Sequence, residues 1–267
     1  MTTSIALDGV ANTRDLGGIV CAGGRPLRSG ALVRSGTLAH ATADDVRTLA
    51  NRNVRLVIDL RCDIESNKAP NRRVPGARME RLPVLEGIMP GVSRDEESDR
   101  RIIEKLARSA AVNPQVAEDY LSGLYRSMMT DPFTQSRYAQ FLQIVANHDP
   151  NHGAILWNCT AGKDRVGLAT VFVLECLGAD RTAITQDYLD TNRFADKTVE
   201  AVTRRVPHLL RRRLTPAIRI LFSAQRSYLD AAYASAEEQC GSMDAFLTEK
   251  LGATPDLRAL MRAHYLM

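Results

Sequence analysis

The stretch that most constrains the fold of this chain runs from residue 154 to 178 and reads AILWNCTAGKDRVGLATVFVLECLG. An apolar run of strand length stops at Cys159, a short loop containing Gly162 follows, and a long apolar helix begins after Arg165. A buried strand that leads through a tight loop into a buried helix is the building unit of α/β folds. This stretch therefore predicts a layered domain with a sheet at its centre.

Other parts of the chain fit the same plan. The segment TADDVRTLANRN is expected to be helical, with Thr42 as the N-cap and acidic residues in the first turn. Short runs rich in β-branched and apolar residues predict strands, although Pro83 weakens one of them. The predicted strands are residues 31–34, 54–60, 79–84 and 153–158. Strands that alternate with helices predict an α/β fold with a mostly parallel central sheet, flanked on both faces by helices.

Two helical segments interrupt this alternation. Residues 93–130 are polar at first and then helical in pattern, and residues 196–234 contain a strongly basic helical stretch that we expect Pro207 and Pro216 to break. There is no internal repeat, low-complexity tract or long linker. Residues 1–267 are therefore predicted to form a single domain with helical insertions near 93–130 and 196–234.

Composition narrows the class of protein. The net charge of +4 suits an anionic substrate but does not require a nucleic acid, and none is predicted as a partner. The N-terminus lacks the pattern of a signal peptide, and no apolar run approaches the roughly 20 residues of a membrane span, so no stable membrane insertion is expected. The five cysteines are odd in number and scattered, which is typical of a reducing compartment and predicts a cytoplasmic location. The oligomeric state cannot be deduced from these features.

The loop after the buried strand carries the chemistry. Cys159 begins the run C-T-A-G-K-D-R, which ends at Arg165. Backbone N–H groups converge at the N-terminus of the following helix, where the helix dipole adds positive potential, and this field favours both a bound phosphate and a thiolate. An arginine guanidinium can bind two phosphate oxygens at once. The alternative is that Cys159 is only a small buried apolar residue, but this does not explain the residues crowded into the turn.

Together with other motifs, this loop resembles the signature of the cysteine-dependent protein tyrosine phosphatases. The resemblance is to their microbial branch, whose loop reads H-C-x-x-G-K-D-R-T-G and which includes mycobacterial and Listeria enzymes acting on phosphotyrosine and phosphoinositides. NTRDLGG at 12–18 resembles the branch's N-F-R-D-L-G-G, and residues 32–65 resemble a block that ends in D-L-R-x-x-x-E. The C-terminal helices are also similar. The resemblance implies a phosphatase fold with a central parallel sheet and a helical lid, placed in one of the two insertions.

The resemblance also implies roles for individual residues. Cys159 matches the nucleophile that forms a phosphocysteine, and Arg165 matches the arginine that binds phosphate and stabilises transition-state charge. Lys163 matches a residue that can reach a second anionic group, and Asp164 matches one that orders the loop or handles a proton. The predicted phosphate- and substrate-binding residues are Asn158, Thr160, Ala161, Gly162, Lys163 and Arg61.

The general acid that protonates the leaving alcohol is not identified by the sequence. There is no W-P-D loop, and Asp59 and Asp63 are candidates because ligands bind at the carboxyl ends of parallel strands. An ion pair between Asp59 and Arg61 that braces the loop is an equal alternative. For Arg14 and Asp15, a structural role beside a tight glycine turn at 17–18 is the preferred interpretation.

Two positions depart from the branch pattern. Asn158 stands where the branch has histidine, which orders the loop, and Val166 stands where it has the threonine or serine whose hydroxyl hydrogen-bonds the departing thiolate. We therefore expect a thiolate that is less favoured, and either a second half-reaction that is slowed or an unusual substrate that supplies the missing group.

Three functions follow, of which a phosphatase with a cysteinyl-phosphate intermediate is preferred. Its substrate would be a phosphotyrosine, a phosphoinositide or a small phosphorylated metabolite such as a nucleotide or sugar phosphate. The alternatives are a phosphate-binding pseudophosphatase and a cysteine enzyme of another class that uses the same anion pocket.

The chemistry needs no metal and no organic cofactor. His148 and His152, four residues apart, are interpreted as a surface loop. The arginines between 204 and 213 could face an acidic substrate, a membrane surface or a nucleic acid, but a solvated helix face is the preferred interpretation, followed by a lid.

Overall fold

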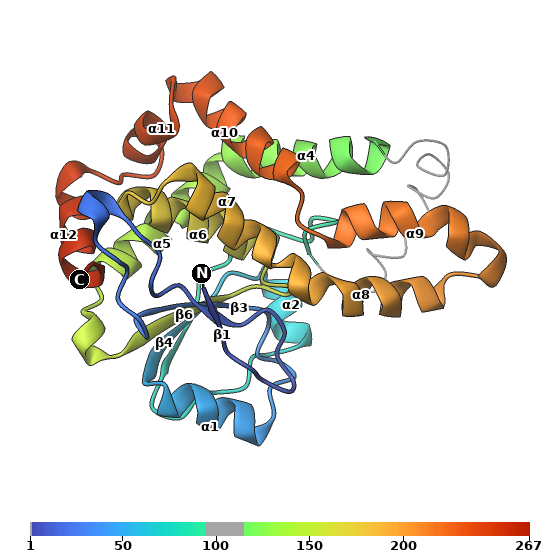
Figure 1. The fold of residues 1–267 in the computed structure, drawn as a ribbon, viewed down its shortest axis with the longest axis horizontal. Coiled ribbons are helices and arrows are strands. Elements are labelled where there is room, and N and C mark those ends of the chain that lie inside the picture. Colours follow the sequence, from blue (N-terminus) through green and yellow to red (C-terminus); the bar gives the residue numbers. More distant parts are fainter. Residues whose placement is uncertain (1, 94–114) are drawn as a thin grey trace.

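A computed structural model describes residues 2–93 and 115–267 of the chain. Its centre is a six-stranded sheet with the order β1-β2-β3-β6-β4-β5 (Figure 1). The strands are β1 (Thr3–Ser4), β2 (Arg14–Asp15), β3 (Leu32–Ser35), β4 (Val54–Asp59), β5 (Arg78–Arg81) and β6 (Ala154–Asn158). β3, β6, β4 and β5 are parallel, whereas β1 and β2 join the β3 edge as antiparallel strands. The predicted α/β class is confirmed, with a mixed rather than wholly parallel sheet.

Helices cover both faces of this sheet. The described helices are α1 (Ala43–Asn51), α2 (Asp63–Lys68), α4 (Gln115–Thr130), α5 (Pro132–Asn147), α6 (Asp164–Leu177), α7 (Arg181–Asp190), α8 (Asn192–Arg205), α9 (His208–Phe222), α10 (Arg226–Cys240), α11 (Met243–Glu249) and α12 (Pro255–Tyr265). Short 3-10 turns lie at Ala22–Gly24 and Pro150–His152. α1 lies on one face, and α5, α6 and α7 lie on the other (Figure 1).

The alternation of side chains along β6 explains these two layers. Ile155 and Trp157 belong to the larger apolar core, whereas Leu156 belongs to the smaller core on the α1 side. Successive side chains of a strand point to opposite faces, so a continuous apolar strand needs cover on both. β6 is buried along its whole length, and Cys159 follows it at the C-terminal edge of the sheet.

The predicted start of α1 is confirmed. Thr42 accepts a hydrogen bond from the backbone N–H of Asp45, and the Asp45 side chain accepts one from the N–H of Thr42, which together form a capping box. The predicted break at Pro207 is also found, since it lies between α8 and α9. The break expected at Pro216 is not found, because α9 continues through it to Phe222 and its inward-facing side chains pack in the core.

The helical insertions are described in part. Residues 94–114 of the first segment lie outside the described residues, and its second half forms α4. The second segment forms α8, α9 and the first part of α10, with α8 and α9 packed side by side as a hairpin (Figure 1). Within the described ranges, no helix is both long enough and apolar enough to cross a membrane. That residues 1–267 form one domain stays a prediction.

Candidate active site

The signature loop, residues 159–165, connects the end of β6 to the first turn of α6. Cys159 is 2% exposed and Arg165 is fully buried. Gly162 has a φ of 64°, and a Cβ at this position would lie 2.7 Å from the carbonyl carbon of Ser35 and 2.8 Å from the nitrogen of Gly36. Only glycine satisfies both the left-handed backbone and this close approach, which explains its place in the loop.

Three successive carbonyl groups of this loop are held by neighbouring parts of the chain. The N–H of Thr37 donates to the carbonyl oxygen of Thr160 at 3.1 Å. Asn12 Nδ2 donates to the carbonyl oxygens of Ala161 at 3.1 Å and Gly162 at 2.8 Å. Arg34 Nη2 also donates to the Gly162 oxygen, at 2.9 Å. These bonds fix the orientation of successive peptide groups.

The loop leads directly into the first turn of α6. The first N–H groups of a helix have no acceptor within the helix, and the helix dipole adds positive potential at the same end, so this position is suited to bind an anion. That residues 160–163 bind the phosphate stays a prediction.

A buried ion pair holds the arginine of the loop. Arg165 Nη2 donates to Glu65 Oε1 at 2.9 Å, and Nη1 donates to Glu65 Oε2. Thr160 Oγ1 also donates to Glu65 Oε1, at 2.6 Å, and the Cys62 N–H donates to Oε2 at 3.2 Å. Burial opposes the charge of Glu65, but the hydrogen bonds and charge of Arg165 outweigh it and lower the pKa of Glu65 to about 2. Arg165 Nε is buried without a hydrogen-bond partner among the described residues, which leaves one donor for a ligand.

Glu65 was not among the predicted site residues. It ends the D-L-R-x-x-x-E pattern, so a sequence signal was present, but nothing local indicates that its partner lies 100 residues further along the chain. Asn12 was also not among the predicted site residues, because the N-terminal motif indicated only Arg14 and Asp15 as candidates.

A second buried ionic cluster braces the loop from the side of β2 and β3. Asp187 on α7 accepts hydrogen bonds from Arg14 Nε at 2.9 Å and from Arg34 Nη1. Burial raises the pKa of Asp187, but the charges of Arg34 and Arg14 more than offset this and hold it below the ordinary value. Arg14 Nη1 donates in turn to Asn12 Oδ1. Asp187 thus fixes Arg34 directly and Asn12 through Arg14, and these two side chains orient the Gly162 carbonyl. The contacts of Arg14 therefore support its structural interpretation.

The side chain before the nucleophile belongs to a third network. Asn158 Oδ1 accepts from Asn71 Nδ2 at 3.0 Å, and Asn158 Nδ2 donates to Asp59 Oδ1 at 3.4 Å. Asn71 Nδ2 also donates to Asp59 Oδ2 at 3.1 Å, while Asn71 Oδ1 accepts from the N–H of Leu38 at 2.9 Å. Asn71 therefore joins the end of β6 to Asp59 at the end of β4 and to the backbone at Leu38. No sequence pattern singled it out.

Asp59 is saturated by its neighbours. Arg61 Nε donates to Asp59 Oδ1 at 2.9 Å and Arg61 Nη2 donates to Oδ2 at 2.7 Å, and Ser66 Oγ donates to Oδ2 at 3.2 Å. Both oxygens of this carboxylate are therefore occupied by hydrogen bonds from neighbouring side chains. The geometry favours the alternative in which Asp59 and Arg61 form a bracing ion pair.

The remaining predicted residues lie at different depths. Asp164 is buried at the start of α6 and accepts a hydrogen bond from Tyr125 Oη at 3.0 Å. Lys163 Nζ lies 3.2 Å from Asp164 Oδ1 and donates to the carbonyl oxygen of Leu221 at 2.8 Å. Its reach to a second anionic group of a substrate stays a prediction. Asp63 is exposed and pairs with Arg81, and Val166 is buried in the first turn of α6.

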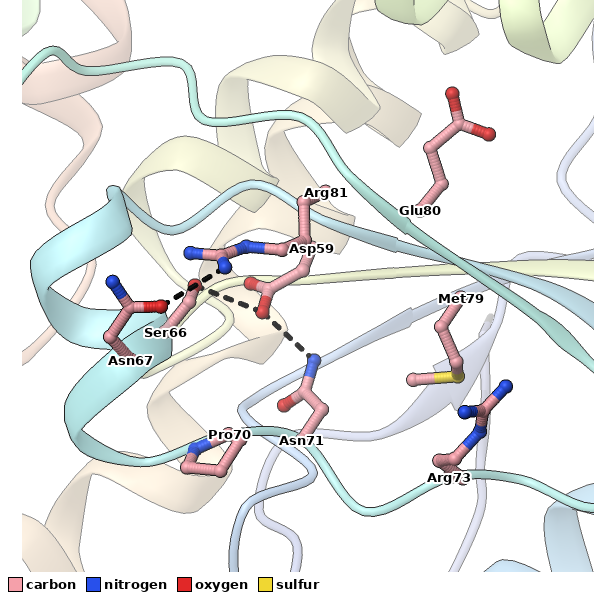
Figure 2. A pocket seen from close by; sticks show the side chains of 9 residues that line it. All are labelled: Asp59, Ser66, Asn67, Pro70, Asn71, Arg73, Met79, Glu80 and Arg81. Carbon is pink, nitrogen blue, oxygen red and sulfur yellow. Dashed lines mark hydrogen bonds between the residues drawn. The ribbon is translucent and has the colours of Figure 1, made fainter.

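A hollow of about 370 Å³ lies beside the loop, between α2, the segment after it and β5 (Figure 2). Asp59 and Asn71 point toward each other on one side of it, and Arg73 and Met79 lie on the other. The hollow includes neither Cys159 nor Arg165, and reaches the loop only through the Asp59–Asn71–Asn158 contacts.

Comparisons with known proteins identify the family of this chain. A sequence model described as the tyrosine phosphatase family matches residues 5–267. A Cupriavidus necator protein, provisionally named a tyrosine-protein phosphatase, is 30% identical over 98% of this chain and 88% of its own. The triple specificity protein phosphatase PtpB of Mycobacterium tuberculosis is 26% identical over 91% and 92%. A tyrosine-protein phosphatase of Nostoc commune is 27% identical over 67% of this chain and 54% of its own.

The fold, the loop and these matches together define a phosphatase of the cysteine-dependent class. The chain belongs to the tyrosine phosphatase family.

Proposed function

We propose that this phosphatase hydrolyses phosphate monoesters through a cysteinyl-phosphate intermediate on Cys159, with phosphotyrosine as the preferred substrate. One observation carries the proposal: the cysteine stands at the end of β6, just before the N-terminus of α6, beside an arginine that Glu65 holds in place. Because Cys159 is 2% exposed, the site favours a phosphate on a long side chain that can reach into it. The resemblance of the loop to a branch that includes enzymes acting on phosphoinositides keeps phosphoinositides among the candidates.

The proposed reaction has two steps. In the first, the Cys159 thiolate attacks phosphorus, a sulfur–phosphorus bond forms, and the bond from phosphorus to the substrate oxygen breaks. The leaving oxygen takes a proton from a general acid, a role we give to Asp164 because it belongs to the signature loop, whereas Asp59 lies on another strand and both its oxygens accept hydrogen bonds from Arg61. In the second step water attacks phosphorus, inorganic phosphate leaves, and the thiolate is restored. The loop amides and Arg165 stabilise the charge that develops on the phosphoryl oxygens in both steps.

The proposal is tested by phosphate release from five substrates: an aryl phosphate, a phosphotyrosine peptide, a phosphoinositide, a sugar phosphate and a nucleoside monophosphate. We expect turnover of the aryl phosphate and the phosphotyrosine peptide. We also expect a rapid acid quench to capture close to one phosphate per chain on a peptide that contains Cys159. Turnover without any captured phosphate would contradict the covalent mechanism, and a preference for the sugar phosphate or the nucleotide would contradict the substrate.

A second candidate is a phosphate-binding pseudophosphatase. Asn158 and Val166 both depart from the branch pattern, and Asn158 is fully engaged by Asn71 and Asp59 rather than turned to a ligand. This candidate predicts that the protein binds inorganic phosphate but turns over none of the five substrates.

Replacing Val166 with threonine is expected to raise the steady-state rate about tenfold, because its hydroxyl would hydrogen-bond the thiolate as it leaves phosphorus. The wild-type protein should release a burst of product close to the enzyme concentration before a slower steady state, and the burst amplitude should not change in the variant. Stopped-flow detection of the released phenol measures both phases.

The matched control is Val171→Thr, which introduces the same hydroxyl at a buried position further along α6. A similar gain in both variants, or a wild-type time course without a burst, would show that dephosphorylation of the enzyme does not limit turnover.

A further inference from the structure

The hairpin formed by α8 and α9 has a tip that differs from the rest of the surface. The two helices run away from the sheet and turn at Val206 and Pro207, at the end of the molecule farthest from α12 (Figure 1). We call residues 203–213 the hairpin tip. At the other end of α9, the Leu221 carbonyl accepts the hydrogen bond from Lys163, so the base of the hairpin is attached to the signature loop.

Two adjacent leucines lie open to solvent at this tip. Leu209 is 92% exposed and Leu210 is 44% exposed, and Leu209 is the most exposed large apolar side chain in the described part of the chain. They do not belong to the apolar stripe with which α9 packs on the body, because that stripe consists of Leu214, Ala217, Ile218, Leu221 and Phe222. A single exposed leucine is ordinary, but two at the end of a projecting hairpin mark a contact surface.

Positive charge is concentrated in the same place. Residues 192–222 contain eight basic and two acidic side chains, a net charge of +6, so the rest of the +4 chain carries a net −2. Both acids are paired within the hairpin, Asp196 with Arg219 and Glu200 with Arg204. The hairpin tip itself contains five arginines and no acid, and Arg212 and Arg213 are exposed beside the leucines.

We infer that the hairpin tip docks on an anionic lipid surface, with Leu209 and Leu210 entering the interface and the arginines binding lipid phosphates. An apolar end surrounded by arginines matches such a surface in both respects, because acyl chains accept the leucines while anionic headgroups attract the charge. A nucleic acid would use the arginines but would leave the leucines without a role. The inference does not depend on the proposed reaction.

The experiment is co-sedimentation of the full chain with vesicles of neutral phosphatidylcholine, or of the same lipid with about 30% phosphatidylserine. We expect binding to the anionic vesicles that weakens as salt is raised, and little binding to the neutral ones. Leu209→Asn combined with Leu210→Asn is expected to lower the partition coefficient at least about fivefold. Arg212→Gln is expected to lower it about fivefold.

The control is Leu260→Asn, which removes a leucine that is 38% exposed on α12 and should leave binding unchanged. Hydrolysis of a soluble aryl phosphate should be the same in all variants, which verifies that they are folded. Loss of binding with Arg212→Gln but not with the leucine pair would overturn the inference in favour of plain electrostatic adsorption. The absence of binding to any vesicle would also overturn the inference. So would a dimer of the wild-type protein, seen by light scattering, that the double leucine variant no longer forms.

Discussion

Replacing Cys159 with serine is expected to lower phosphate release from an aryl phosphate by at least about 10³-fold. A serine hydroxyl holds its proton far more strongly than a thiol, so the anion that attacks phosphorus is scarcely formed even with the same amides around it. The amides from Thr160 to Val166 and the Arg165–Glu65 pair are unchanged by this substitution. The variant should therefore still bind inorganic phosphate, which equilibrium dialysis can measure beside the rate.

The control for this variant is Cys176→Ser, because Cys176 is also fully buried and lies on α6 but is remote from the loop. Cys176→Ser can lose stability but should keep its rate when folded. Residual activity of the Cys159→Ser protein within tenfold of wild type would show that another group attacks phosphorus. Loss of phosphate binding together with loss of activity would show that Cys159 is needed to form the phosphate-binding loop.

The parts of the site that are continuous in sequence could be predicted, and the parts assembled from distant segments could not. The strand, the loop and the helix around Cys159 are adjacent, so their order alone indicates an anion site at a helix N-terminus. Asn12 and Arg34 hold the Gly162 carbonyl from more than 120 residues away. Such pairs depend on the strand order β2-β3-β6, which no local pattern specifies.

The network at Asn158 is a second example of contacts between distant segments that the sequence does not predict. The sequence identified Asn158 as a departure from histidine but not what it contacts, because Asn71 lies in an irregular segment without a motif. Asp59 and Arg61 were predicted both as site residues and as a bracing pair, and only the hydrogen bonds of Asp59 favour the second. Pro216 failed as a helix break because the packing of α9 against the core outweighs one lost backbone hydrogen bond.

Replacing Glu65 with glutamine is expected to destabilise the fold by about 3 to 5 kcal/mol at neutral pH and to lower kcat/KM by about 10²-fold or more. Glutamine has nearly the same shape but no charge, so Arg165 is left buried with an uncompensated positive charge. The same change removes a charged acceptor from Thr160 Oγ1. Urea unfolding and aryl phosphate kinetics measure the two effects. The matched control is Glu80→Gln, whose partly exposed ion pair with Arg78 should contribute about 1 kcal/mol or less.

The pH dependence of this loss separates the charge of Glu65 from its shape. The pKa of Glu65 falls from an ordinary 4.5 to about 2 in the folded chain, which corresponds to about 3 kcal/mol of stabilisation above pH 4.5. Because the folded-state pKa is the lower one, this stabilisation is lost as the pH falls from about 4.5 through about 2. The stability difference between wild type and Glu65→Gln should therefore shrink steadily over that interval. A difference that stays constant down to pH 2 would mean that the glutamine acts through packing, and that Arg165 does not depend on the carboxylate charge.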